Sequence, residues 1–432
     1  MNADLLTNDC LAQVPGEDPH ITSRYAINFV RGLQEGAEDP THLKVIATCK
    51  HYFAYDVDAG NASYGTHREP TYDRHHFNAI VSKADLAEYY LPAWEACATE
   101  GRAASIMCSY NALNGTPSCA NSKYQNVLLR DTWGWGAEKP GDNVSSSVLS
   151  PYIVSDCHAI GDMATTCDCS GGKPGGYKHP GHNFVKTGNE AVAAALFGGT
   201  DVNCGCYYQN WLNYALGNKT SGLTSTAVDL AAGRVANALI RVGALDAEGM
   251  SSPFTKIPTT VVDNAAARAL ALEAAQQSIV LLENRPVALR TSGSDSSGAG
   301  KPLLPLNVGT NINKLAFIGP HANATQAMLS NYHGDNVLVN EHSPLAAAKA
   351  RWPSAAVTHV AGVNDTATIN TDGVSAAAAA AKDADVAVVF VGLTPCNGWS
   401  KQVCNEGESH DRNEHYDSAV RVIIDTDQAG VC

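Results

Sequence analysis

The segment Tyr152–Cys157, "YIVSDC", is a short apolar run that stops abruptly on the carboxylate of Asp156. An Asp directly after a strand often begins the next turn, and that structural role stays open for Asp156 taken alone. Three other runs, "KVIATC" (44–49), "AASIMCS" (103–109) and "TDVNC" (200–204), read as strands of the same kind.

Polar groups follow or end each of these expected strands. Lys50 and His51 come directly after the first run, Tyr110 follows the second, and Asp201 and Asn203 lie in the last. In a (β/α) barrel the carboxyl ends of the strands meet on one face, where catalytic groups are placed. The repetition therefore favours a shared site at that face.

Helical periodicity fills the gaps between the strands. The segment 84–100 has apolar residues at helical spacing, with Asp85 and Glu88 as a capping-box-like start and a glycine as the stop. Further helices are expected over 189–198 and 226–242. Such alternation predicts an α/β fold with parallel strands.

The pattern changes after residue 242. The stretch "GALDAEGMSSPFTKIP" (243–258) loses periodicity and collects Gly, Ser and Pro, as a linker does. A helix over 264–277 and strands in "KLAFIGP", "AAVTHV" and "DVAVVFVGL" then predict a second α/β unit. We expect a first domain, a linker and a second domain over 1–245, 246–262 and 263–432.

Composition limits the classes of function. The chain has 432 residues and a formal net charge of −14, which argues against nucleic acid and anionic membranes as partners. The sequence holds no apolar run of about 18 residues, so no transmembrane helix is expected. The first residues lack the layout of a signal peptide.

The residues at the strand ends suit carbohydrate chemistry. Lys50 and His51 offer donors for hydroxyl groups, and Tyr110 offers an aromatic face and a hydroxyl. A carboxylate such as Asp156 among these donors is expected to stay ionised at neutral pH, as a nucleophile or a stabiliser of positive charge. Glycoside hydrolysis needs in addition a second, protonated carboxyl group from elsewhere in the chain.

Longer motifs strengthen this interpretation. Four motifs resemble glycoside hydrolase family 3. They are "KHYFAYD" (50–56), "HFNAIVSKADLAEYYLPAWEACATEGRAASIMCSYNALNGTPSCAN" (76–121), "YIVSDC" (152–157) and "GTDVNCG" (199–205). They look closest to its β-xylosidase branch, which carries "SDC" where β-glucosidases usually carry "SDW". The resemblance continues through "AARALALEAAQQSIVLLEN" and "KLAFIGPHAN" to "EGESHDR" (406–412).

The resemblance implies a TIM-like (β/α) barrel, incomplete at its N-terminal side, followed by an incomplete α/β sandwich domain with a parallel sheet. It implies Asp156 as the nucleophile of a retaining exo-glycosidase that removes terminal β-D-xylosyl residues. Glu406 takes the place of the acid/base, with Glu408 as the alternative. The subsite residues carried over are Lys50, His51, Met107 and Tyr110.

Several alternatives stay open at this point. A solvated acidic loop is the structural reading of Glu406–Arg412. The substrate is a glycoside or oligosaccharide of xylose, of arabinofuranose, or of glucose if the chain is a β-glucosidase; a hexosaminidase fits the motifs less well. An inactive fragment is the alternative of another class. The mechanism requires no cofactor and no metal.

The chain also departs from the family pattern. Cys10 stands where family members carry an Arg before "PGEDP", and the segment after Arg412 differs from the expected continuation. Both termini therefore look shortened, and we expect the chain on its own to fold poorly or to be inactive.

Weaker signals concern cysteines, histidines and glycosylation. Cys108 with Cys119, and Cys396 with Cys404, are close enough in sequence to form disulfides. His75 and His76 are expected at the surface, and Trp399 either stacks on a sugar or covers a core edge. A zinc site is disfavoured for Cys167, Cys169, His179 and His182. Glycosylation sequons and the resemblance suggest secretion: Asn61, Asn114, Asn143, Asn218, Asn323 and Asn364.

Overall fold

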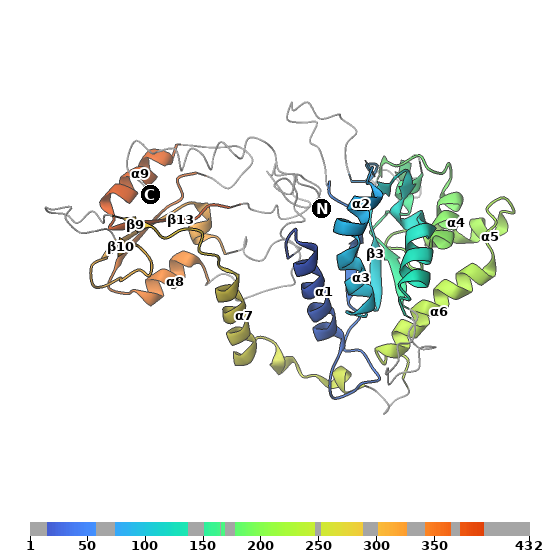
Figure 1. Cartoon of the computed structure of the whole chain (residues 1–432), viewed down its shortest axis with the longest axis horizontal. Coiled ribbons are helices and arrows are strands. Elements are labelled where there is room, and N and C mark those ends of the chain that lie inside the picture. Colours follow the sequence, from blue (N-terminus) through green and yellow to red (C-terminus); the bar gives the residue numbers. More distant parts are fainter. Residues whose placement is uncertain are drawn as a thin grey trace. The chain divides into compact units, whose positions relative to one another are not determined.

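The computed structural model describes residues 15–57, 74–136, 151–164, 166–168, 178–246, 252–287, 301–325, 342–363 and 372–392. The chain divides into two compact units, Met1–Thr259 and Thr260–Cys432, which are described separately. Their elements follow one another along the chain from blue to red in Figure 1.

A parallel sheet forms the centre of the first unit. Its strands β1 (Thr48–Tyr52), β3 (Ser105–Cys108) and β6 (Tyr152–Ser155) lie in the order β1-β3-β6. Val202 adds a single parallel bridge to Val154, so "TDVNC" contributes less than the full strand predicted from it. The predicted parallel α/β arrangement is confirmed for these strands.

Helices cover this sheet (Figure 1). Helix α1 (Pro19–Gln34) packs on α3 (Pro92–Thr99), and α4 (Gly188–Gly198) packs on α5 (Tyr207–Gly217) and α6 (Ser225–Arg241). The helices predicted over 189–198 and 226–242 are thus confirmed to within a residue at each end. Helices α1 and α5 have no counterpart in the sequence-based prediction.

The helix predicted over 84–100 is built from three pieces. A turn α2 (Lys83–Asp85) leads through a π-helical turn η3 (Leu86–Tyr90) into α3. The backbone amide of Asp85 donates to the side chain of Ser82, so the helix begins at Ser82 and the predicted Asp85–Glu88 start is wrong. Ser is a preferred N-cap because its hydroxyl oxygen accepts an otherwise unpaired amide of the first turn.

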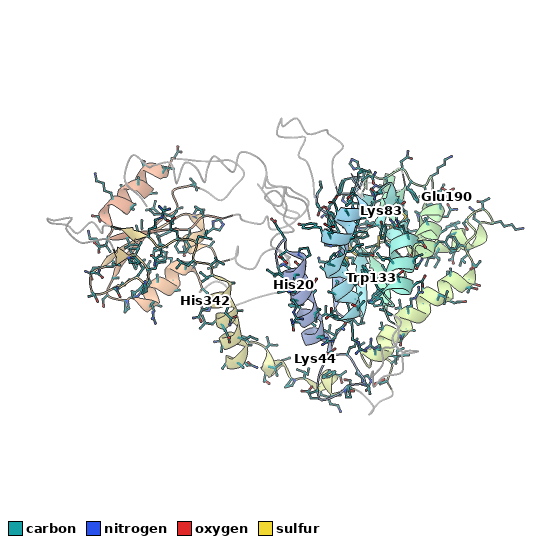
Figure 2. All side chains as sticks on the ribbon, in the orientation of Figure 1. His20, Lys44, Lys83, Trp133, Glu190 and His342 are labelled. Atoms are coloured by element: carbon teal, nitrogen blue, oxygen red, sulfur yellow. A yellow bond between two sulfur atoms is a disulfide. The ribbon has the colours of Figure 1, made fainter. Side chains whose placement is uncertain are left out.

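Caps also fix the ends of α4. The Thr187 side chain and Glu190 (labelled in Figure 2) form a capping box, and the helix ends at Gly199 with φ at 105°. Only glycine adopts this left-handed conformation without strain, which explains why the helix ends at residue 198, as predicted.

One side chain ties α1 to the start of two strands. Gln34 is 2% exposed; its Oε1 accepts from the backbone amides of Ala47 (3.2 Å) and Ala104 (2.8 Å). Its Nε2 donates to the carbonyl of Arg102 at 2.9 Å. These bonds satisfy buried backbone groups that would otherwise lose water without replacement.

Shorter elements complete the first unit. They are β2 (Asn78–Ala79), β4 (Ala112–Leu113) and β5 (Thr116–Pro117) in one small sheet, the antiparallel pair β7 (Thr166–Asp168) and β8 (Lys178–Pro180), a π-helix η5 (Lys123–Thr132), and the 3₁₀ turns η4 (Ser118–Ala120), η7 (Gly161–Met163) and η8 (Pro253–Lys256). The 3₁₀ turn η9 (Thr259–Val261) begins at the last residue of the first unit and continues into the second.

The second unit holds another parallel sheet. Strands β11 (Lys314–Ile318), β12 (Ala356–Val360) and β13 (Val386–Val389) lie in the order β12-β11-β13. The predicted strands in "KLAFIGP", "AAVTHV" and "DVAVVFVGL" are therefore confirmed. The helix predicted over 264–277 is α7 (Ala265–Ser278), and it is capped by Asn264. The remaining elements are β9 (Pro286–Val287), β10 (Lys301–Pro302), the turn η10 (Pro320–Asn323), α8 (Pro344–Arg351) and α9 (Val374–Asp383).

Alternate residues of β11 enter two different cores. Leu315 and Phe317 belong to a cluster with Leu345 of α8, whereas Ala316 and Ile318 belong to one with Ala377 of α9. Successive strand side chains point to opposite faces. The sheet is therefore covered on both faces, as parallel sheets generally are.

Candidate active site

A bulge in β1 places two of the predicted site residues. Cys49 pairs with Ile106 and Tyr52 with Cys108, so Lys50 and His51 together face the single residue Met107 of β3. The prediction that Lys50 and His51 follow the strand is wrong, because β1 continues to Tyr52 and contains both residues. A bulge redirects the side chains of its strand, and bulges are frequent beside active sites.

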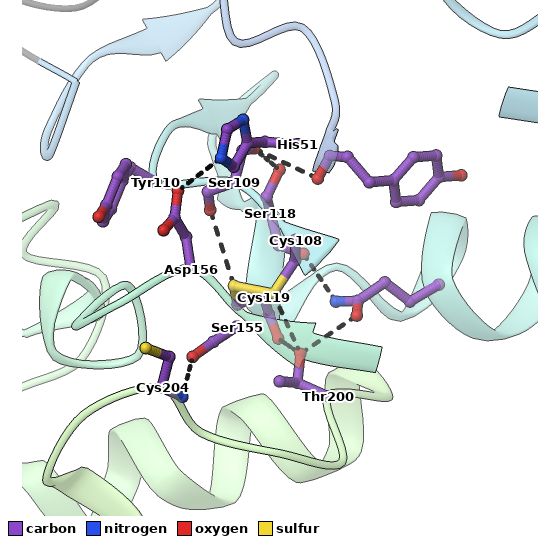
Figure 3. Close-up of a disulfide and its surroundings, with 12 residues drawn as sticks. His51, Cys108, Ser109, Tyr110, Ser118, Cys119, Ser155, Asp156, Thr200 and Cys204 are labelled. Atoms are coloured by element: carbon purple, nitrogen blue, oxygen red, sulfur yellow. Dashed lines mark hydrogen bonds and ion pairs between the residues drawn. A yellow bond between two sulfur atoms is a disulfide. The ribbon is translucent and has the colours of Figure 1, made fainter. Parts of the chain in front are cut away.

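Asp156 follows β6 directly. Its backbone amide donates to the carbonyl of Cys108 at 2.9 Å, and its Oδ1 accepts from the Cys157 amide at 2.7 Å. Its Oδ2 lies 3.3 Å from Nε2 of His51 (Figure 3). The Asp156 side chain keeps 11% of its surface exposed, so the carboxylate is held on several sides and still accessible.

Burial controls the protonation of this pair. Desolvation raises the pKa of Asp156 to about 6, against the opposing effects of the Cys157 amide, the Arg74 charge, a Tyr110 hydrogen bond and the Lys50 charge. The prediction that donors keep this carboxylate ionised at pH 7 therefore holds by a margin of roughly tenfold, although the pKa moves upward.

His51 is neutral at the same pH. Burial, together with the charges of Lys50 and Arg74, lowers the pKa of the imidazole to about 3. Its 3.3 Å contact with Asp156 is therefore not an ion pair, and it is a hydrogen bond only in the tautomer that carries the proton on Nε2. The positive charges that act on Asp156 are therefore those of Arg74 and Lys50, and both favour its ionised form.

Tyr110 is surrounded by aromatic and basic groups. Its ring lies 5.9 Å from that of Tyr55 and 4.6 Å from that of His75, and the guanidinium of Arg74 lies 4.8 Å from its centroid. Arg74 also donates to the Tyr55 hydroxyl at 3.3 Å. In Figure 3 the side chains of Tyr110, His51 and Asp156 lie together.

Arg74 and His75 were not anticipated as site residues. Both are 9% exposed, so the prediction that His75 is a surface residue is wrong. His75 is buried because its Nδ1 bonds the carboxylate of Asp162, 87 residues away in sequence, at 2.9 Å. The local sequence "DRHHF" carries no sign of this contact.

Asp201 and Asn203 bind residues of β6, the strand that carries Asp156. Both oxygens of Asp201 are taken by Arg130 (2.8 Å), Arg234 (2.7 Å) and the Ile153 amide (2.8 Å). Asn203 donates to the Ser155 hydroxyl at 3.3 Å. Asp201 is therefore an anchor of β6, and the expectation that it offers chemistry at the shared face is corrected.

Disulfides brace the strands that carry the site. The predicted bridge between Cys108 and Cys119 is present and lies beneath Asp156 and His51 in Figure 3. Cys157, next to Asp156, is joined to Cys204, and Cys49, next to Lys50, is joined to Cys97. The last two span 47 and 48 residues, a separation at which sequence gives no pairing.

Some predicted residues lie outside the described part of the chain. They include Glu406, Glu408, Trp399, Cys396 and Cys404, and the side chains of Cys167, Cys169 and His179. His182 is described, and its Nε2 donates to the backbone carbonyl of Tyr110 at 2.7 Å.

The described ranges hold no cluster of three or more His, Cys, Asp or Glu side chains suited to binding a metal ion. Among the same residues, no helix has both the length and the apolar character needed to cross a bilayer.

Comparison with protein families identifies the class to which this site belongs. Residues 13–238 match the glycosyl hydrolase family 3 N-terminal domain, and residues 279–426 match the C-terminal domain of the same family. The chain belongs to glycosyl hydrolase family 3.

Comparison with individual proteins shows which members of the family the chain resembles. The chain is 37% identical over 402 residues to a probable exo-1,4-beta-xylosidase xlnD of Neosartorya fischeri, covering 93% of this chain and 43% of that protein. It is 34% identical over 401 residues to beta-xylosidase/alpha-L-arabinofuranosidase 2 of Medicago sativa subsp. varia, with the same coverage. The chain thus spans less than half the length of these relatives.

Solved structures agree on the fold. A GH3 exo-beta-xylosidase (XlnD) in complex with a xylobiose aziridine activity-based probe matches with a TM-score of 0.70 and 30% identity, over 93% of this chain and 43% of that one. A beta-glucosidase from Listeria innocua in complex with glucose matches with a TM-score of 0.67 at 19% identity, covering 98% and 48% of the two chains.

Proposed function

We propose that this protein is a retaining exo-glycosidase that removes terminal β-D-xylosyl residues from xylo-oligosaccharides. The observation that carries the proposal is the carboxylate of Asp156, held at the end of β6 within 3.3 Å of a neutral His51. The relatives named as beta-xylosidases give the sugar. The proposal includes a TIM-like barrel for the first domain and an α/β sandwich for the second.

The first chemical step assigns a role to each carboxyl group. Asp156 attacks the anomeric carbon while Glu406, protonated, gives its proton to the leaving oxygen, so that a glycosyl–Asp156 ester forms and the aglycone departs. In the second step Glu406, now ionised, takes a proton from water, which attacks the anomeric carbon and frees Asp156. Two displacements retain the anomeric configuration.

The remaining residues hold the sugar. Lys50, exposed in the β1 bulge, supplies donors for sugar hydroxyls, and His51 in its Nε2–H tautomer offers Nδ1 as an acceptor. Met107 opposite them and Tyr110 line the same subsite. We add Arg74, which stacks on Tyr110 and whose charge favours the ionised Asp156. No cofactor enters the scheme, because proton transfer and nucleophile both come from carboxyl groups.

Covalent trapping tests the proposal. A 2-fluoro-xyloside or a xylose-configured aziridine should add one sugar to the full chain, and peptide mass spectrometry should place it on Asp156. Asp156→Asn should not be labelled, whereas Asp39→Asn, at a His–Asp pair between α1 and β1, should be labelled as in the wild type. Absence of label from the wild-type chain under all conditions would favour the inactive-fragment alternative.

A panel of aryl glycosides tests the sugar. Turnover of the β-xyloside above the α-L-arabinofuranoside and the β-glucoside supports the proposal. Preference for the β-glucoside would assign the chain to the other activity of this scaffold.

We also propose an extracellular location. Three disulfides join described cysteines of the first unit, and Cys206 is disulfide-bonded as well, which suits an oxidising compartment. Secretion and glycosylation at the sequons can be checked by endoglycosidase treatment of the protein from its natural source.

A further inference from the structure

Tyr110 is held from two directions by contacts that meet at one residue. On the side of its ring, His75 packs against it with ring centroids 4.6 Å apart, and Nδ1 of His75 bonds Oδ2 of Asp162 at 2.9 Å. On the side of its backbone, the Tyr110 carbonyl accepts from Nε2 of His182 at 2.7 Å. The amide of His182 in turn donates to the carbonyl of Asp162 at 2.6 Å.

Asp162 itself has little freedom to move. Its side chain is fully buried and it lies in the 3₁₀ turn η7, where the adjacent Met163 is also 0% exposed. The amides of Phe184 and Val185 both donate to the Met163 carbonyl, at 2.9 and 3.0 Å. The turn with Asp162 and the segment with His182 therefore form one hydrogen-bonded unit.

Close packing at Gly181 reinforces this unit. A Cβ atom at Gly181 would lie 2.6 Å from the carbonyl oxygen of Asp162 and would also collide with the carbonyl of Ala164. The segment that contains Gly181 and His182 can approach η7 this closely only because residue 181 has no side chain. This approach brings the His182 imidazole within reach of Tyr110.

The protonation of the histidines agrees with anchoring. His182 must carry its proton on Nε2, because its partner is a carbonyl, and burial lowers the pKa of His182 so that it is neutral at pH 7. His75 donates from Nδ1 to a carboxylate, which orients the ring and fixes its tautomer. Each imidazole therefore acts as a directional link.

We propose that Asp162 is a positioning residue: through His75 and His182 it fixes Tyr110, and Tyr110 holds the carboxylate of Asp156 in place. The inference rests on the proposed function only where Asp156 is called a nucleophile. The side chains of Tyr110 and Asp156 lie next to one another (Figure 3), and interaction with Tyr110 lowers the pKa of Asp156 against the effect of burial. The pKa of Asp156 therefore reports whether Tyr110 is in position.

The sign of the pKa change separates positioning from direct electrostatics. Removing the Asp162 charge by Asp162→Asn would, by direct Coulomb interaction alone, make Asp156 easier to ionise and lower its pKa. Loosening Tyr110 would weaken the hydrogen bond to the Asp156 carboxylate and raise its pKa. The two roles predict opposite shifts.

The experiment is a ¹³C NMR titration of the full chain with aspartate labelled at Cγ. The Asp156 signal is assigned by its absence in Asp156→Asn. We expect Asp162→Asn to raise the titration midpoint of Asp156 by about 0.5–1 pH unit. This shift corresponds to losing part of the free energy of a charge-assisted hydrogen bond. Asp39→Asn, which disrupts the 2.6 Å His42–Asp39 pair elsewhere in the same unit, should leave the midpoint unchanged.

A double-variant cycle tests the route. Tyr110→Phe should raise the midpoint by itself, and adding Asp162→Asn should then have no further effect. If Asp162→Asn does not fold by circular dichroism, His75→Gln replaces it, because glutamine can still donate to Asp162 but presents no ring to Tyr110. An unchanged or lowered midpoint, or a shift that persists without the tyrosine hydroxyl, overturns the proposal.

These outcomes differ from a failure of the proposed function. The titration needs no turnover, so a raised midpoint in a chain that forms no glycosyl ester supports the positioning role and rejects the glycosidase. If the chain is active, the acid limb of kcat/KM in Asp162→Asn should move in the same direction as the NMR midpoint.

Discussion

At the scale of single residues, the site depends on one carboxylate whose burial disfavours its ionised form. Burial raises the pKa of Asp156 even though Lys50 and Arg74 lie near enough to lower it. The residue is therefore ionised at neutral pH with a small margin. This state suits a nucleophile, because a carboxylate with few counter-charges is more ready to form a bond.

The first prediction concerns pH. Asp156 must be ionised to attack, and its pKa lies at about 6, above the ordinary value of 3.8. We expect kcat/KM to fall about tenfold per pH unit below about pH 6. Arg74→Met should move this limb to higher pH, because it removes a charge that favours the anion. A limb that stays near pH 4 in the wild type would contradict the assignment.

The second prediction concerns stability. The pKa of Asp156 is raised from 3.8 to about 6 by folding, so ionisation of this residue lowers the free energy of unfolding. The loss is full above about pH 6, becomes smaller between pH 6 and 3.8, and is absent at lower pH. Asp156→Asn should therefore increase the free energy of unfolding at pH 7, by up to about 3 kcal/mol, and have little effect near pH 3.5. Urea unfolding at both pH values measures this.

Asp385 provides a control of opposite sign. The amides of Asn313 and Lys314 lower its pKa, so Asp385→Asn should destabilise the second unit at pH 7. An Asp156→Asn variant that loses stability at pH 7 as Asp385→Asn does would contradict the prediction.

At the scale of elements, β6 depends on the charged network beneath it. The carboxylate of Asp201 is 2% exposed and binds Arg130, Arg234 and the backbone of β6. Burial lowers the pKa of Arg130 to about 10, although Asp201 acts to raise it. Asp156, at the end of β6, is therefore positioned partly by groups on the opposite side of the strand.

The third prediction removes this support. Asp201→Ala leaves two guanidinium groups without their carboxylate and should cost about 3–5 kcal/mol of unfolding free energy. The exposed pair of Lys314 and Asp383 gives the comparison: Asp383→Ala should cost less than about 1 kcal/mol. Equal losses in the two variants would show that the Asp201 network does not anchor β6.

Sequence reasoning succeeds for elements whose residues are contiguous. The strands at 105–108 and 152–155 and the helix at 188–198 follow from local apolar patterns and glycine stops. It fails at the β1 bulge, because a bulge depends on the register with a partner strand. It also fails for His75, whose burial depends on Asp162, far away along the chain.

At the scale of the whole molecule, the cross-links recorded for described cysteines lie in the first unit. Three disulfides close intervals of 48, 11 and 47 residues, and Cys206 of the same unit is also disulfide-bonded. In the chain-entropy model such loops contribute about 3–4 kcal/mol each. The folding of the first unit should therefore respond to redox conditions in a way that the described part of the second does not.

The fourth prediction tests this difference. Reduction and alkylation should speed hydrogen exchange more in peptides from β1, β3 and β6 than in peptides from β11, β12 and β13, which contain no cysteine. Mass spectrometry of the same digest reads both units, so each sample contains its own control. Equal acceleration in the two sheets would contradict the prediction.

The contacts of Gln34 have a consequence for how the first unit opens. One amide side chain serves as the hydrogen-bond partner at the amino ends of two neighbouring strands, so the last turn of α1 behaves as part of the sheet. A thermal fluctuation that unwinds this turn uncovers the amides of Ala47 and Ala104 together. The amino ends of β1 and β3 should therefore lose these hydrogen bonds when the last turn of α1 unwinds. Local opening of the strands and unwinding of the helix end become one event.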